Sequence, residues 1–196
     1  MNKKEEILKI ASKEFAKYGY NGVSLENIAK KAKITKATIF YYFNNKKTLF
    51  EAVIVPRIEE LIKEIYSFES ENPKEELKHY IYSFAKIFKK YPCFAAILAH
   101  EFVDGGRDLS DDTIKLLSKA FKKLITILKD GEEKNIFKID NPFSIQLMIV
   151  SALIMHQTTK EMRRRVSKFI EIELNPDIKD IADAIYTKIL KAILKD

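Results

Sequence analysis

Residues 34–43 read ITKATIFYYF, and four aromatic side chains crowd the end of this short stretch. A fully buried helix would not carry Lys36 and two threonines beside these rings, and an ordinary surface helix would not expose so many of them. One side of the stretch is therefore expected to serve the protein's own core, while the other side meets a partner.

Capping signals place this stretch in the second of two short helices. Ser24 precedes a helix predicted over about residues 25–32, and Thr35 precedes a second one over about 36–42. Both residue types are favoured N-caps. Ala29 is small enough to let the second helix cross closely over the first. Two helices joined by a tight turn form the helix-turn-helix, whose second helix enters the major groove of DNA.

The helical period divides the second helix into two faces. Ile39 and Phe43 are expected to face the core. The other face carries hydroxyl groups, a lysine and a methyl group, which suit phosphate oxygens and base edges. The flat rings of Tyr42 and its neighbour end in hydroxyls that can reach a phosphate. The outward set is Thr35, Lys36, Ala37, Thr38 and Tyr41.

The net charge of +7 lies entirely in the first quarter of the chain. Residues 1–50 hold eleven lysines and four glutamates, with no arginine or aspartate, whereas the remainder is neutral. A basic module on a neutral body favours contact with a polyanion such as nucleic acid. Charge alone leaves open a lysine-rich face that meets only solvent.

The segment SLENIAKKAKITKATIFYYFNNKKTLF (24–50) closely resembles the DNA-binding signature of the TetR family of transcriptional regulators. The resemblance covers roughly residues 5–54 and implies a three-helix DNA-binding domain followed by a larger helical regulatory domain. The positions that match the family's DNA-contacting set are Ser24, Thr35, Lys36, Thr38, Tyr41, Tyr42 and Lys46.

Two positions depart from the family pattern. Lys33 stands where the family usually has a glycine, so either this residue adopts φ > 0 or the turn differs slightly. Phe40 stands where the family often has tyrosine, which removes a hydroxyl contact and leaves this ring able to pack inward. Neither departure threatens the fold, but the second puts one backbone contact in doubt.

Helical periodicity continues through the rest of the chain, and no convincing strand pair interrupts it. Helix starts, marked by an N-cap residue before a proline or an acidic first turn, are predicted at Asn72-Pro73, Ser110, Asn141-Pro142 and Asn175-Pro176-Asp177. The helix that begins at residue 141 is expected to run to about Arg165. The predicted fold class is all-α with about nine helices, comprising a helix-turn-helix domain (1–45) and a helical regulatory domain (46–196).

The TetR resemblance implies that the last two helices form a dimer interface, and the residues support this independently. The stretch IQLMIVSALIMHQTTKEM (145–162) is apolar nearly all round, which is more than one neighbouring core needs. Two such helices from each subunit could pack as a four-helix bundle. The expected interface residues are Met148, Ser151, Ile154, Met155, Ile181, Ile185 and Ile189.

The resemblance also implies a pocket for a small, mainly apolar effector among the middle helices. Aromatic residues are dense between positions 66 and 102, and they could line a cavity for a flat or greasy ligand. Taken singly, each of these side chains is better explained as core. The candidate lining is Tyr66, Tyr80, Phe84, Phe88, Phe94, Phe102, Phe121, Met148 and Met155.

Other classes of protein find little support. The lone Cys93 cannot form an internal disulfide, which fits a reducing compartment. The chain starts without a signal peptide, and its most apolar stretch (145–155) is too short for a bilayer, which needs roughly 20 residues. We therefore expect a cytoplasmic protein without membrane contact. Three histidines without ligand spacing predict no metal site, no cofactor is expected, and no nucleophile–base pair indicates an enzyme.

The leading hypothesis is a homodimeric repressor that binds a pseudo-palindromic operator in double-stranded DNA and is released by its effector. Two alternatives stay open. One is a DNA-binding dimer that is controlled by a protein partner or acts architecturally, and the other is a small-molecule enzyme on an all-helical fold. The sequence does not decide between repression and activation.

Overall fold

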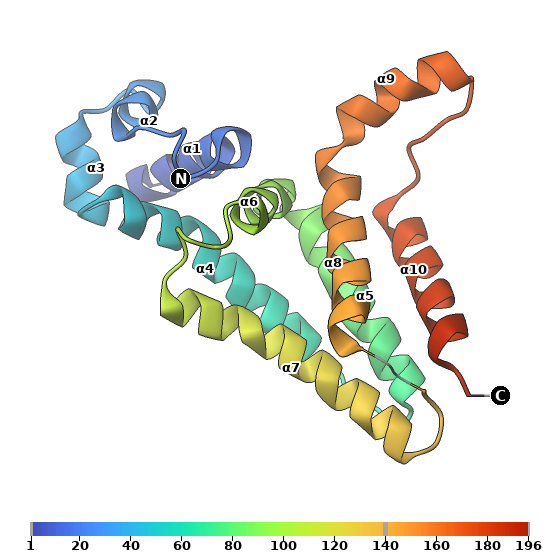
Figure 1. The fold of residues 1–196 in the computed structure, drawn as a ribbon. Coiled ribbons are helices and arrows are strands. Elements are labelled where there is room, and N and C mark those ends of the chain that lie inside the picture. Colours follow the sequence, from blue (N-terminus) through green and yellow to red (C-terminus); the bar gives the residue numbers. More distant parts are fainter. Residues whose placement is uncertain (1, 139–140, 196) are drawn as a thin grey trace.

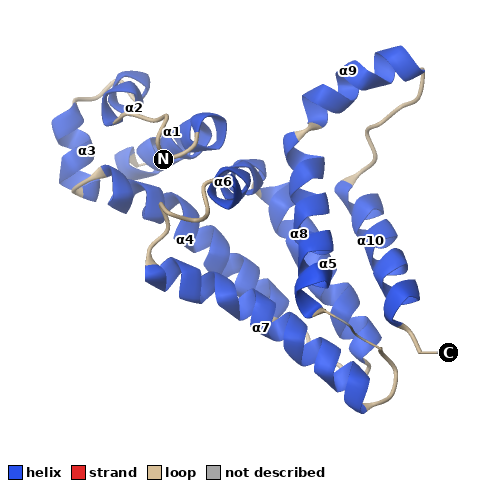
Figure 2. Cartoon of the chain, viewed as in Figure 1, coloured by secondary structure: helices blue, strands red, loops and turns tan. Residues whose placement is uncertain are grey.

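The computed structural model describes residues 2–138 and 141–195, and that part of the chain contains ten helices. Apart from an isolated antiparallel bridge between Phe137 and Leu194, every regular element described is helical (Figure 2). The all-α fold predicted from the periodicity is therefore confirmed. The helices are α1 Lys3–Tyr18, α2 Leu25–Lys31, α3 Lys36–Phe43, α4 Lys46–Ile65, α5 Pro73–Lys90, α6 Pro92–Val103, α7 Asp111–Glu133, α8 Pro142–Thr158, α9 Lys160–Ile170 and α10 Ile178–Ile193.

Helices α1, α2 and α3 form a small head at one end of the molecule (Figure 1). The core of the head is filled by Ile7 and Phe15 from α1, Ile28 from α2 and Ile39 from α3, all fully buried. Within this head, a partly buried ion pair joins α1 to the end of α2, with the Lys31 Nζ 2.5 Å from a carboxylate oxygen of α1. The apolar faces predicted for these helices thus meet one another as expected.

The turn between α2 and α3 is tight and left-handed at one residue. Lys33 stands where the family usually has a glycine, and it adopts the positive φ expected at that position, 51°. The backbone N–H of Ile34 donates to the carbonyl of Ala29 at 3.0 Å and closes the turn. A non-glycine residue in this conformation costs about 1 kcal/mol, which the packing of two buried helices can offset.

The other helices form a larger body around α5. This helix contacts α4, α7, α8 and α10, so it lies at the centre of the body. Its start follows the prediction, because the Asn72 side chain accepts a hydrogen bond from the backbone of Lys74 and Pro73 occupies the first turn. A buried ion pair between Glu76 and Lys123, 2.8 Å long, joins α5 to α7.

The prediction of one helix from residue 141 to about 165 is wrong. Two helices stand in its place, which brings the number of helices among the described residues to ten. The structure breaks the predicted helix after Thr158 into α8 and α9. Thr158 and Thr159 each donate a side-chain hydrogen bond to the carbonyl four residues earlier, a pattern that bends helices. Arg163 then donates to the carbonyl of His156, which the break leaves free. The two halves consequently point in different directions, and α9 projects beyond the body (Figure 1).

The head and the body meet along α1, α4 and α6. Helix α1 packs against both α4 and α6, and the Phe15 and Phe50 rings lie 5.0 Å apart, edge to face. Asn21 in the head donates a hydrogen bond of 3.2 Å to Asp108, which follows α6. Helix α4 begins at Lys46, where the sequence predicts the domain boundary, and continues from the head into the body.

Candidate nucleic-acid interface

Helix α3 lies at the outer edge of the head, and its start is held by its own side chains (Figure 1). The Thr35 hydroxyl accepts a hydrogen bond of 3.2 Å from the Thr38 backbone N–H, and the two threonine hydroxyls lie 2.9 Å apart. Ser24 serves α2 in the same way by accepting from the Asn27 N–H at 3.2 Å. The capping residues predicted for both helices are therefore in place, and they fix the direction of α3.

The two faces of α3 separate as predicted. Ile39 and Phe43 are buried at 0% and 2% exposure, whereas Tyr41 is 82% exposed. Thr35, Lys36 and Ala37 are exposed, and Thr38 and Tyr42 are half-buried. The Tyr41 and Tyr42 rings pack edge to face at 5.1 Å between centroids, which limits their rotation. This face presents hydroxyls, a methyl group, an ammonium and two phenols together.

Lys36 does not project freely from this face. Its ammonium forms an ion pair with Glu26 of α2, which holds the pKa of the Glu26 carboxyl below its usual value. The same ammonium lies 5.6 Å from the centre of the Phe40 ring. A phosphate or guanine that recruits Lys36 must therefore compete with an exposed carboxylate.

Lys46 is held against the head as well. Its Nζ lies 4.2 Å from the centre of the Tyr20 ring, and burial lowers the pKa of this ammonium. The residue is half-buried at the first position of α4, where the Asn45 side chain caps the helix by accepting from Thr48. Lys46 thus follows the C-terminal end of α3 in the chain, but its ammonium packs on the Tyr20 ring, outside α3.

Phe40 departs from the expectation that it could pack inward. Its ring is 40% exposed and lies on the outer face with Lys36, Ala37 and Tyr41. At about 100° per residue, Ala37 and Tyr41 lie opposite to Ile39 and Phe43, whereas Phe40 lies at the boundary between the two sides, so the helical period does not decide where its ring packs. Phe40 belongs to the outer face and can offer apolar contact to a thymine methyl group.

A second unusual surface lies on α8. Phe143, Leu147, Met148 and Met155 are exposed by 59%, 55%, 46% and 53%, which gives this helix a largely apolar face. Of the residues predicted for the dimer interface, Met148, Ser151 and Met155 lie on this face, and Ile181 and Ile185 of α10 are half-buried. Ile154 and Ile189 are buried at 3% and 1% within the same chain.

Only part of the set predicted to line an effector pocket lies together. Tyr80, Phe84, Phe88 and Phe94 are buried and follow one another in ring contacts with centroids 5.2–5.9 Å apart. Tyr80 also donates a hydrogen bond of 2.6 Å to Gln146. The rest of the set lies elsewhere: Phe121 is half-buried against Phe143, and Tyr66, Phe102, Met148 and Met155 are exposed.

The described residues hold neither a metal cluster nor a membrane span. No group of three or more His, Cys, Asp and Glu side chains there is arranged to hold a metal ion. None of the described helices combines the length and the apolar character needed to cross a membrane. The exposed face of α3 is the candidate site, because its hydroxyls, ammonium and rings suit the phosphates and bases of nucleic acid.

Comparison with known proteins agrees with this geometry. The profile of the family described as "Bacterial regulatory proteins, tetR family" matches residues 7–53, which contain α2, α3 and the start of α4. The HTH-type transcriptional repressor NicS of Pseudomonas putida is 26% identical over 179 residues, 87% of this chain and 82% of NicS. The HTH-type transcriptional regulator RutR of Escherichia coli is 29% identical over 111 residues, and this match spans 52% of the length of RutR.

Solved structures share the arrangement of helices over nearly the whole chain. A mutant of HlyIIR superposes with a TM-score of 0.68 at 26% identity, covering 99% of this chain and 96% of that one. PfmR, a TetR family regulator from Thermus thermophilus, gives a TM-score of 0.68 at 22% identity, covering 94% and 97%. The chain belongs to the TetR family of transcriptional regulators. It is therefore a DNA-binding regulator and not an enzyme.

Proposed function

We propose that the protein is a homodimeric repressor that reads a pseudo-palindromic operator through the outer face of α3 and is released by a small, mainly apolar effector. The exposed face of α3 carries this proposal, because it combines an ammonium, hydroxyls and aromatic rings on a helix that is rigidly capped. These groups suit phosphate oxygens, base edges and the thymine methyl group. As a transcriptional regulator it would act on DNA in the cytoplasm.

The apolar face of α8 supports the dimer. A monomer rarely leaves so many large side chains of one helix uncovered, and a two-fold contact would cover Leu147 and Met148 of both copies. Two heads related by two-fold symmetry would place two copies of α3 about one turn of DNA apart, which is why we expect a pseudo-palindrome. Similarity to a protein described as a repressor, NicS, favours repression over activation.

A selection from random duplexes with the purified full chain, at two salt concentrations, tests the proposal. We expect one pseudo-palindromic sequence to be recovered. Tyr41→Ala should weaken its binding selectively, and Lys129→Ala, at an exposed position of α7, should leave it unchanged. Recovery of no preferred sequence, with affinity that depends on salt alone, would mean that phosphate attraction is the whole interaction.

A second candidate is a DNA-binding dimer without a small-molecule effector. The buried rings of Tyr80, Phe84 and Phe88 favour it, because they fill the region of the body where the sequence predicts an effector pocket. Once the operator is known, its affinity can be measured against a library of apolar compounds. Release by at least one compound supports the effector, and equal affinity of every compound for the free and DNA-bound protein supports the second candidate.

A further inference from the structure

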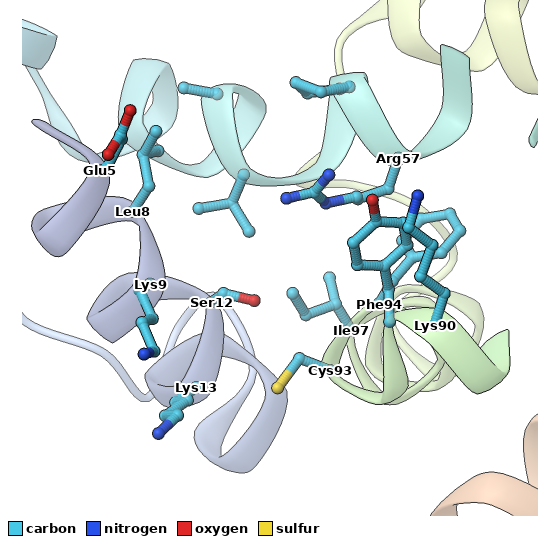
Figure 3. Close-up of a pocket in the computed structure, with 14 residues that line it drawn as sticks. Glu5, Leu8, Lys9, Ser12, Lys13, Arg57, Lys90, Cys93, Phe94 and Ile97 are labelled. Carbon is cyan, nitrogen blue, oxygen red and sulfur yellow. The ribbon is translucent and has the colours of Figure 1, made fainter. Parts of the chain in front are cut away.

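A cavity of about 500 Å³ lies between the head and the body, away from the outer face of α3. Its walls come from α1 of the head, from the middle of α4, and from the end of α5 and the start of α6 in the body (Figure 3). This volume falls in the range of cavities that hold small molecules. The predicted effector pocket shares one residue with it, Phe94.

The inner wall of the cavity is apolar and its rim is basic. Leu8, Ala52, Val53 and Ile97 contribute hydrocarbon surface, so that a hydrocarbon ligand would lose contact with water there. One carboxylate, from Glu5, lines the rim beside several cations, and a second, from Glu60, pairs with Lys90 next to it. The cations that line the cavity are Lys9, Lys13, Arg57 and Lys90. A ligand that fits both surfaces has a hydrocarbon body and a negative charge.

Arg57 is the cation best placed to hold that charge. Its guanidinium lies 3.9 Å from the centre of the Tyr91 ring, which fixes its plane, and it is half-buried. The carboxylate of Glu60 is 3.9 Å from one guanidinium nitrogen. That carboxylate already accepts hydrogen bonds from Lys90 at 2.6 Å and from the Tyr91 hydroxyl at 2.8 Å. The guanidinium therefore keeps donors for a ligand.

Figure 3 shows the Arg57 guanidinium directed into the gap between the helices, with the Ser12 hydroxyl of α1 facing the same space. The two α1 lysines, Lys9 and Lys13, lie at the edge of the gap. A planar guanidinium binds a carboxylate through two parallel hydrogen bonds, and a hydroxyl can donate a third. The lysines alone would be explained as solvated surface groups, but a half-buried arginine above an apolar wall would not.

We propose that this cavity binds a small organic carboxylate with a hydrocarbon body. Arg57 and Ser12 hold the carboxylate, the rim lysines attract it, and the apolar wall from α1, α4 and α6 covers the hydrocarbon. Carboxylates of this kind are small enough to enter a cavity of about 500 Å³ as single molecules.

The position of the cavity gives the ligand a regulatory consequence, which rests on the proposed function. Because one wall belongs to the head and the others to the body, a bound ligand stabilises one separation of α1 from α6. If operator DNA requires a different separation, ligand and operator weaken each other's binding by the same factor. The carboxylate then acts as the releasing effector.

Binding can be measured through Cys93, which lines the cavity and is the only cysteine in the chain. We would follow alkylation of the full-length protein by iodoacetamide, a neutral reagent, in the presence of octanoate, 1-octanol or acetate. Octanoate at ten times its dissociation constant should slow alkylation about tenfold by mass action. Octanol matches its hydrocarbon and acetate matches its charge, so each should protect much less. Equal protection by either one, or none by octanoate, overturns the proposal.

Two arginines provide a matched test of the charge. Arg57→Gln should raise the dissociation constant for octanoate about tenfold, as expected for the loss of a charge-assisted pair. Arg107 also has a carboxylate three residues away at 4.0 Å but lies outside the cavity, so Arg107→Gln should leave the constant unchanged. If both changes weaken octanoate binding equally, octanoate is held only by general electrostatic attraction to the positively charged protein. Ser12→Ala, on α1, tests the same carboxylate contact from another helix and should also raise the dissociation constant. In these variants titration calorimetry measures the dissociation constant in place of Cys93 alkylation.

The regulatory part is tested with the selected operator and octanoate. We expect octanoate to lower operator affinity, and operator DNA to raise the octanoate dissociation constant by the same factor. Protection of Cys93 with unchanged operator affinity would overturn the effector role. Failure to recover an operator would overturn the proposed function, while the binding of octanoate to the free protein would still decide whether the cavity is a carboxylate site.

Discussion

The outer faces of α3 and α8 both leave large side chains uncovered, but with different chemistry. On α3, Lys36, Tyr41 and half-buried Tyr42 combine charge, hydroxyls and rings. On α8, Leu147 and Met148 lie on a face that is almost wholly apolar. The first surface suits a polyanion such as DNA, whose phosphates and bases it can contact. The second surface suits another apolar protein surface, as in the dimer proposed above, so the two faces suit different kinds of partner.

The largest expected effect comes from placing a charge on α8. Leu147→Glu should weaken self-association about 100-fold or more, because two buried carboxylates would face each other across a two-fold contact. Operator affinity should fall with it, since each head would then bind alone. Sedimentation across a dilution series measures the first effect, and Val103→Glu, at an exposed apolar site on α6, is the control. If self-association is unchanged, the apolar face of α8 is not the dimer contact.

The faces of α3 and α8 keep their relative positions only while the head stays packed on the body. The junction between head and body contains a buried acid. Glu101 of α6 is 1% exposed, and burial, with Asp108 and Asp104 nearby, raises the pKa of its carboxyl to about 7. Between pH 4.5 and 7 the unfolded chain has lost this proton and the folded chain keeps it, so stability should fall as the pH rises. Glu101→Gln should remove a loss on the order of 2–3 kcal/mol.

Urea unfolding at about pH 5 and about pH 8, on either side of this window, measures the effect. The wild type should be less stable at the higher pH, and the difference should shrink in Glu101→Gln. Glu59→Gln removes the same charge from an exposed position of α4 and should keep the wild-type dependence. If stability rises with pH through this range in the wild type, Glu101 is not the group that titrates at the junction.

On α3 itself, Tyr41→Ala should lower operator affinity about tenfold, the loss expected when a ring and its hydroxyl leave a DNA contact. The variant should fold normally, because the ring is 82% exposed. Fluorescence anisotropy with the selected operator measures the effect. Tyr66→Ala, which removes an exposed ring from the body, should not change it. A tenfold loss in both would show that the ring on α3 has no special role.

Lys36→Ala should have a smaller effect, roughly fivefold, because the ammonium must first leave Glu26. If Lys36 meets a phosphate, the logarithmic salt slope should fall by about one unit across all sequences. If it meets guanine instead, discrimination at one operator position should relax. Titrations at several salt concentrations on two operator variants distinguish the two contacts, and an unchanged affinity would exclude Lys36 from the interface.

The smallest expected effect is an increase. Glu26→Gln removes the carboxylate that competes for Lys36, so operator affinity should rise by about two- to threefold at low salt. The gain should vanish in the double variant with Lys36→Ala, which identifies the ion pair as its source. A gain that persists without Lys36 would instead reflect the general rise in positive charge.

Local signals predicted most of the helix boundaries. Thr35 and Ser24 cap the helices that they precede, and Asn72 with Pro73 starts α5 as expected. Such signals act within one turn of the chain, so they can be read without knowing the fold. The break after Thr158 was missed, because two adjacent threonines in an apolar run give no strong stop signal and Arg163 acts from the next helix.

The candidate DNA-binding face could be predicted from the sequence because it lies on one helix, and the spacing of Ile39 and Phe43 sets its orientation. Even there, the pairing of Lys36 with Glu26 joins residues ten positions apart on two helices. The predicted effector pocket depends on many helices at once. Whether Phe84 and Phe88 line a space or fill one is decided by what packs against them.

Repeating local patterns in the chain were enough for the all-helical class, for a basic head on a neutral body and for the side of α3 that faces outward. Each follows from side chains a few residues apart. The tertiary structure alone decided where the head rests on the body, which acid is buried at that junction and where a cavity remains between α1, α4 and α6. The cavity, for example, is lined by Ser12, Arg57 and Cys93, residues distant in sequence that only packing brings together.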